Sequence, residues 1–62
     1  MPRHLLLVED NEIFAQLMLE LFQRHNGDTW DVAHVSTFAE TLQHLAQHPV
    51  DLLVLDLNLP DM

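Results

Sequence analysis

The sequence predicts an α/β domain of three layers, in which three parallel strands form a sheet with helices on both faces. Two observations support this prediction. Unbroken apolar runs at residues 5–8 and 52–55 are typical of strands that are buried on both faces, as in parallel sheets. Strand and helix patterns also alternate along the chain in the order β-α-β-α-β, and short segments connect them. Such alternation implies right-handed crossovers between parallel strands.

The first strand, residues 5–8, stops at the acidic pair Glu9-Asp10. Asp10 or Asn11 can cap the helix that follows, and Glu12 lies in the first turn, where negative charge is favoured. Apolar residues then recur at spacings of three and four and predict one broad buried face, from which only Leu19 departs. The face consists of Ile13, Phe14, Leu17, Met18, Leu21 and Phe22. Gly27 suits the left-handed position that ends such a helix.

Residues 30–35 alternate between apolar side chains, at Trp30, Val32 and Val35, and polar ones, at Asp31 and His34, and His34 is expected to face outward. This pattern indicates a half-exposed strand at the edge of the sheet, with Trp30 packing there. Thr37 and Glu40 have the spacing of a capping box, which starts a second helix at about residue 38. Pro49 ends that helix. Its predicted apolar face is Phe38, Leu42 and Leu45.

The third strand, residues 52–55, leads directly into Asp56. Pro60 cannot donate a hydrogen bond to a sheet, so the strand must end before it. The two unbroken apolar runs should lie next to each other and the alternating strand at the edge, which gives the order 2-1-3. Because parallel strands end at the same rim of a sheet, we expect the carboxylates of Glu9, Asp10 and Asp56 to converge there.

The composition narrows the class of protein. A chain of 62 residues makes at most one small domain, and without cysteine it has neither disulfides nor thiolate metal sites. Ten acidic residues against two basic ones give a net charge of -8, which argues against nucleic acid or an anionic membrane as partner. The apolar runs are too short to span a bilayer, and no signal peptide is recognisable. We therefore expect a cytoplasmic protein.

Three converging carboxylates repel one another unless a cation offsets their charge. Mg²⁺ accepts one or two carboxylates in its shell and keeps several waters. A carboxylate beside Mg²⁺ can also attack phosphorus and form an acyl phosphate. The alternative interpretation is an acidic rim that is simply solvated and holds no metal.

The acidic pair in Val8-Glu9-Asp10 and the segment 56–62, DLNLPDM, resemble the N-terminal half of a response-regulator receiver domain from two-component signalling. The resemblance implies a flavodoxin-like fold and makes residues 1–62 a single partial receiver domain rather than an enzyme. It also implies that Asp56 accepts phosphate from a histidine kinase or phosphotransfer protein. Asp10 would ligate Mg²⁺ directly, Glu9 would help through water, and Asn58 would contribute its backbone carbonyl.

A complete receiver is about twice this length and carries a Ser or Thr and a Lys beyond its third strand. The present chain contains no lysine. The alternative function is therefore a structural or dimerising module without phosphotransfer; a small-ligand site fits the tight acidic rim less well. A third strand left at the edge favours either self-association, for example as a dimer, or pairing within a longer parent chain.

His44 and His48 have the i, i+4 spacing of a metal-binding pair. No third ligand stands near them in sequence, and both lie off the predicted apolar face. A solvated helix surface is therefore the expected interpretation.

Overall fold

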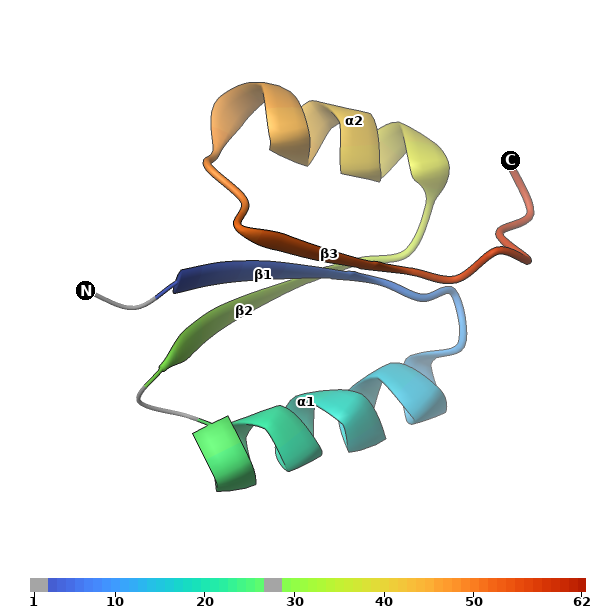
Figure 1. The fold of residues 1–62 in the computed structure, drawn as a ribbon. Coiled ribbons are helices and arrows are strands. Elements are labelled where there is room, and N and C mark those ends of the chain that lie inside the picture. The colour runs from blue at the N-terminus through green and yellow to red at the C-terminus, as the bar shows by residue number, and fades with distance from the viewer. Residues whose placement is uncertain (1–2, 27–28) are drawn as a thin grey trace.

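A computed structural model describes residues 3–26 and 29–62, so the predicted role of Gly27 lies outside the described residues. The elements follow the predicted order (Figure 1). They are β1 (Arg3–Val8), α1 (Glu12–Asn26), β2 (Trp30–Val35), α2 (Phe38–Gln47) and β3 (Leu52–Leu55). Among the described residues, neither helix combines the length and apolar character needed to cross a membrane.

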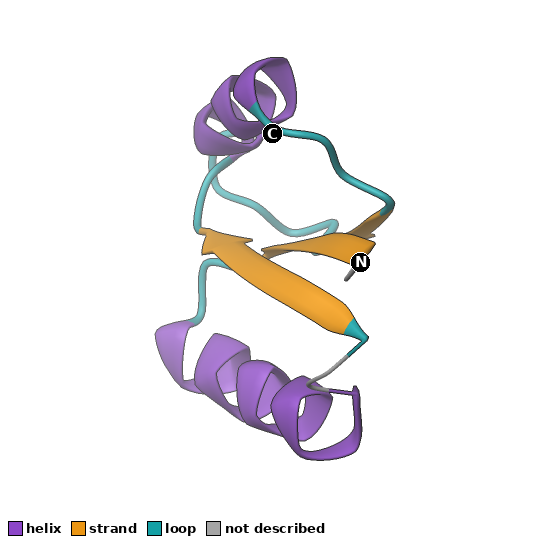
Figure 2. Cartoon of the chain, turned by 90° about the vertical axis from the view of Figure 1, so that its left-hand side faces the viewer, coloured by secondary structure: helices purple, strands orange, loops and turns teal. Residues whose placement is uncertain are grey.

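The three strands are parallel and lie in the order β2-β1-β3, which confirms the predicted fold class. The two helices lie on opposite faces of the sheet and complete the three layers (Figure 2). The apolar residues of the central strand, from Leu5 to Val8, are almost completely buried. Leu5 and Leu7 belong to the core on the α1 side, while Leu6 and Val8 belong to the core on the α2 side. An unbroken apolar run is what a strand covered on both faces requires.

Helix α1 begins at an Asn11 cap, whose side-chain oxygen accepts the Phe14 N–H at 3.0 Å. Its predicted buried face is partly wrong. The helix contacts the sheet through a narrower stripe at positions i, i+3, i+4 and i+7, which includes the supposed exception Leu19. The stripe is Ala15, Met18, Leu19 and Phe22. The other apolar residues remain about half exposed or more, because three strands are too narrow to cover so broad a face; they are Ile13, Phe14, Leu17 and Leu21.

Thr37 caps α2 as predicted: its side chain accepts the Glu40 N–H at 3.1 Å. The reciprocal half of the capping box is shifted by one residue, because the Glu40 carboxylate accepts the N–H of Ser36 at 3.3 Å and not that of Thr37. The predicted apolar face of this helix needs correction as well. Phe38 packs on the α2-side core, but the buried neighbour is Thr41, which is 2% exposed, and not Leu42, which is 54% exposed. Leu45 is also exposed. The Thr41 hydroxyl tolerates burial because it donates to the Thr37 carbonyl at 2.9 Å.

The segment after β3 packs against α2 and forms hydrogen bonds with its first turn. Leu59 is buried in the α2-side core. Asp61 accepts the backbone N–H groups of Phe38 and Ala39 at 2.8 and 3.0 Å. These amides belong to the first turn of α2 and have no partner within the helix, so Asp61 acts as a second cap supplied from a distant segment.

Protonation of Asp61 is expected to release this segment from α2. The hydrogen bonds from Phe38 and Ala39 lower the pKa of Asp61 from its ordinary 3.8. A carboxylate with a lowered folded-state pKa stabilises the fold above its unfolded pKa, and that contribution is lost as the pH falls through the folded value. The backbone amide shifts of Phe38 and Ala39 in NMR spectra should therefore titrate together below pH 3.8.

The matched variants are Asp61→Asn and Asp51→Asn. The first should change the Phe38 and Ala39 amide shifts at neutral pH as well, whereas the second, at the far end of β3, should leave them unchanged. If the amide shifts of Phe38 and Ala39 change neither on acidification nor in the Asp61→Asn variant, Asp61 does not cap α2.

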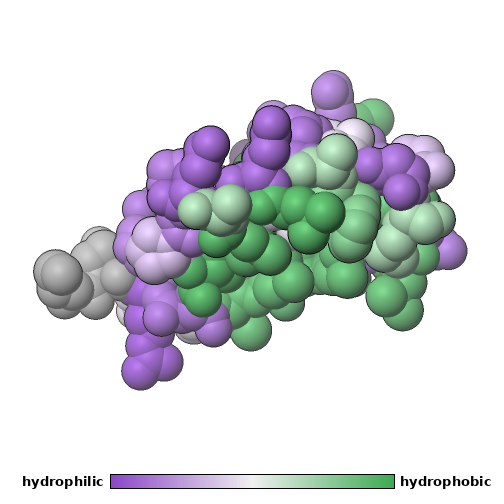
Figure 3. Space-filling model, turned by 90° about the horizontal axis from the view of Figure 1, so that it is seen from above, coloured by the Kyte–Doolittle hydropathy of each residue, from purple (hydrophilic) through white to green (hydrophobic). Residues whose placement is uncertain are grey.

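A hydrophobic surface extends over the face seen from the side of α2 (Figure 3). Leu42, Leu45 and Leu53 are exposed large hydrophobic residues that belong to this side of the fold. The prediction that the third strand is covered on both faces is therefore wrong for its first half, since Leu52 and Leu53 are 43% and 40% exposed. β3 pairs only with β1 and forms an edge of the sheet in the part of the chain described here.

Candidate functional site

The acidic residues that follow β1 and β3 lie at the same rim of the sheet. In the parallel register, Val8 is paired with Val35 on one side and with Leu55 on the other, so the three strands end level with one another. The backbone hydrogen bonding between the strands continues for one residue beyond these ends. The Glu9 N–H donates to the Val35 carbonyl at 3.1 Å, and the Asp56 N–H donates to the Val8 carbonyl at 3.0 Å. The backbone therefore fixes Glu9 and Asp56 directly beyond neighbouring strand ends.

Glu9, Asp10 and Asp56 each offer a carboxylate oxygen, and these oxygens all lie within 4.8 Å of one another. Their exposures differ: Glu9 is buried, Asp56 is half-buried and Asp10 is exposed. Three hard oxygen donors at such separations, open to water on one side, suit a cation that keeps part of its hydration shell. Mg²⁺ fits this description. The donor set agrees with the predicted site, and the role of each residue stays a prediction.

Backbone amides orient two of the three carboxylates. Glu9 Oε1 accepts the Asn11 N–H at 3.1 Å, which holds this buried carboxylate near the positive end of α1. Asp56 Oδ1 accepts the Asn58 N–H at 3.0 Å. The backbone amide of Asn58 therefore contacts the acidic cluster. The role of its carbonyl oxygen as a metal ligand stays a prediction. Within the described residues, no hydrogen bond involves Asp56 Oδ2.

His34 contacts this rim, although the sequence pattern suggested that it faces outward. Its Nε2 lies 2.8 Å from the Glu9 carbonyl oxygen, so the ring donates a hydrogen bond in the tautomer protonated there. The side chain is half-buried on β2. The only sequence signal was its position one residue before the carboxyl end of that strand, which alternation alone assigned to solvent.

An open groove of about 370 Å³ leads away from the acidic cluster on the α1 side of β3. Phe14 and Met18 of α1 form one wall, and Val54 and Leu57 form part of the other. Glu9, Asp56 and Asn58 line its polar end. The half-buried Asp56 carboxylate can therefore be approached from solvent by a reacting group.

Two comparisons with known proteins agree with this geometry. Residues 5–62 match the model of the family described as "Response regulator receiver domain". The TorCAD operon transcriptional regulatory protein TorR of Escherichia coli O157:H7 is 36% identical over 61 residues. That alignment covers 98% of the present chain and 25% of TorR, so the chain spans about a quarter of the relative's length. No solved structure matches.

Proposed function

The chain belongs to the response-regulator receiver domain family, and we propose that it is the phosphate-accepting module of a two-component response regulator. Residues 1–62 then form part of a receiver that acts in the cytoplasm and takes phosphate from a histidine kinase or phosphotransfer protein. The observation that carries this proposal is the cluster of Glu9, Asp10 and Asp56 at the carboxyl rim of a parallel sheet. Because this segment has a net charge of -8, we do not propose that it binds nucleic acid.

Asp56 is the proposed nucleophile. Because the Asn58 N–H occupies Oδ1, Oδ2 is the oxygen directed to the reaction. Oδ2 forms a bond to phosphorus while the phosphorus–nitrogen bond of a phosphohistidine breaks, and the electron pair of that bond stays on the imidazole nitrogen. The product is an acyl phosphate on Asp56. The chain is therefore a substrate of phosphotransfer and not a classical enzyme.

Asp10 and Asp56 are the proposed direct ligands of Mg²⁺, with Glu9 acting through water and Asn58 through its carbonyl. When bound, the ion supplies positive charge that offsets the charge of the phosphoryl group and of the acidic cluster. The protein contributes the arrangement. Glu9 is held by the Asn11 amide, and its backbone is fixed by β2 and by the His34 ring.

The direct test uses acetyl phosphate as a small phosphate donor. The chain is incubated with acetyl phosphate and Mg²⁺, and its intact mass is measured with and without chelator. We expect a gain of one phosphoryl group that requires Mg²⁺. A folded chain that gains no mass would reject the proposed phosphotransfer.

The second candidate is a structural or dimerising module, and the exposed edge strand favours it. Leu52 and Leu53 are 43% and 40% exposed on β3, whose outer edge pairs with no other described strand. Such an edge is a template for strand addition. A second copy of the chain, related by a two-fold axis, can pair with this edge, and so can a further part of a longer parent chain. Absence of phosphate uptake together with a dimer in sedimentation would select this function.

A further inference from the structure

The end of the sheet opposite the acidic cluster contains a second group of metal-ligating side chains. A pocket of about 160 Å³ lies there, between the amino-terminal end of the sheet and the last turn of α2. His4, Asp31, His44 and His48 line it. These four residues come from β1, β2 and the end of α2, so only the fold brings them together. We call this group the histidine pocket.

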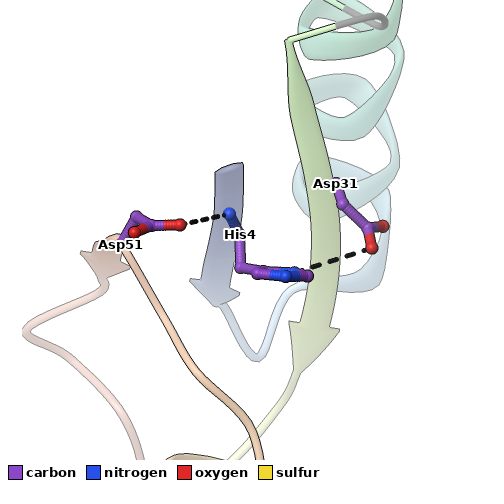
Figure 4. A network of polar contacts seen from close by, with 3 residues as sticks. All are labelled: His4, Asp31 and Asp51. Carbon is purple, nitrogen blue, oxygen red and sulfur yellow. Dashed lines mark hydrogen bonds and ion pairs between the residues drawn. The ribbon is translucent and has the colours of Figure 1, made fainter. Parts of the chain in front are cut away.

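His4 and Asp31 form one half of the histidine pocket. They are paired across β1 and β2, and their side chains point toward each other (Figure 4). His4 Nδ1 lies 3.6 Å from Asp31 Oδ2. Two ligands of one tetrahedral zinc ion are separated by about 3.3 Å, given metal–ligand bonds of about 2.0 Å. The pair therefore needs little movement to share an ion.

The backbone of His4 is held in place on its other side by Asp51, the residue before β3. The His4 N–H donates to Asp51 Oδ2 at 2.7 Å (Figure 4). The Asp51 N–H donates in turn to the His4 carbonyl at 2.7 Å. These two bonds fix the start of β1 without using the imidazole ring. The ring thus remains available to a ligand.

His44 and His48 form the other half. The His48 N–H donates to the His44 carbonyl at 2.9 Å, which preserves the helical i, i+4 relation although His48 itself is extended. Their ring centroids are 4.7 Å apart. His44 is half-buried and His48 is exposed, so neither ring is enclosed by the core and both have room to change rotamer. Two imidazoles one helical turn apart are an established way of chelating zinc.

We propose that the histidine pocket binds one Zn²⁺ ion, with imidazole nitrogens of His4, His44 and His48 and a carboxylate oxygen of Asp31 as ligands. Three nitrogens and one oxygen suit zinc, whereas the all-oxygen acidic cluster suits a hard cation. In the described part of the chain, only the acidic cluster has three such ligand atoms within 4.8 Å of one another, so rotation of His48 and His44 must close the zinc site. The inference does not depend on phosphotransfer.

The test is a Zn²⁺ titration by isothermal calorimetry in saturating Mg²⁺, which keeps the acidic cluster occupied. We expect one zinc per chain. His44→Gln combined with His48→Gln should weaken binding by at least about tenfold, because two of four ligands are lost. His34→Gln is the matched control: it makes the same change at a histidine that contacts Glu9 and lies outside the pocket. It should leave zinc affinity unchanged, as should Asp56→Asn.

Three results would overturn the proposal. The first is no binding of one zinc per chain. The second is unchanged affinity in the His44→Gln/His48→Gln variant, with an unaltered circular dichroism spectrum as proof of folding. The third is loss of zinc binding in Asp56→Asn, which would place the ion at the acidic cluster. Should the double variant fail to fold, His48→Gln alone decides, since His48 is exposed and lies beyond the end of α2.

Discussion

Asp56→Asn is expected to abolish the gain of phosphate from acetyl phosphate. Asparagine keeps the shape of the side chain, and its carbonyl oxygen can still accept the Asn58 N–H that now reaches Oδ1 at 3.0 Å. It has no carboxylate to form an acyl phosphate, so the covalent step is lost while the fold is kept. Intact-mass spectrometry after incubation with acetyl phosphate and Mg²⁺ measures this directly.

Asp51→Asn is the matched control, because Asp51 precedes the same strand and lies at the opposite end of it. Its carboxylate contacts His4 and is remote from the acidic cluster. The Asp51→Asn protein should gain one phosphoryl group like the unaltered chain. Full phosphate uptake by Asp56→Asn would show that another residue is the acceptor.

Leu6→Ala is expected to remove a large part of the protein's stability. Leu6 is completely buried at the centre of the α2-side core, between neighbours on both adjacent strands. Removing such a side chain costs about 2–5 kcal/mol in lost burial and cavity formation. Domains have roughly 0.05–0.15 kcal/mol of stability per residue, so a chain this short holds only about 3–9 kcal/mol in total. Urea denaturation followed by circular dichroism measures the loss.

Leu53→Ala provides the comparison, since it removes the same atoms from a leucine that is 40% exposed on β3. Its free energy of unfolding should change by less than half as much as that of Leu6→Ala. Equal losses for the two variants would mean that the α2-side core is not centred on β1.

The strands and their order were predictable because each depends on a short-range pattern. The unbroken apolar run of β1 predicted burial on both faces, and the alternating β2 predicted an edge. The order β2-β1-β3 and the convergence of Glu9, Asp10 and Asp56 were predicted from these two patterns together with the apolar run of β3, and the structure has both. The burial predicted from that third run was wrong for Leu52 and Leu53. The family resemblance added the proposed roles, which the fold alone does not provide.

The helix faces were less predictable, because periodicity locates an apolar stripe but not the width of the surface that covers it. α1 has two adjacent stripes, and only the one containing Ala15 and Leu19 contacts the sheet. Likewise, burial of Thr41 in place of Leu42 depends on the rotation of α2 and on a local hydrogen bond. The contact of His34 with Glu9 joins residues 25 positions apart, and no local pattern encodes it.

The proposed phosphotransfer requires that acidic residues from the ends of β1 and β3 share one cation. Mn²⁺ can replace Mg²⁺ at oxygen sites, and it broadens the NMR signals of nearby nuclei. Titration of the ¹⁵N-labelled chain with Mn²⁺ should first broaden the amides of Glu9, Asp10, Asp56 and Asn58, and Asp10→Asn should weaken this effect. The amides of His4 and Asp51, at the opposite end of the same strands, should stay sharp. Broadening that begins at His4 and Asp51, or that is unchanged in Asp10→Asn, would show that these acidic residues do not share a cation.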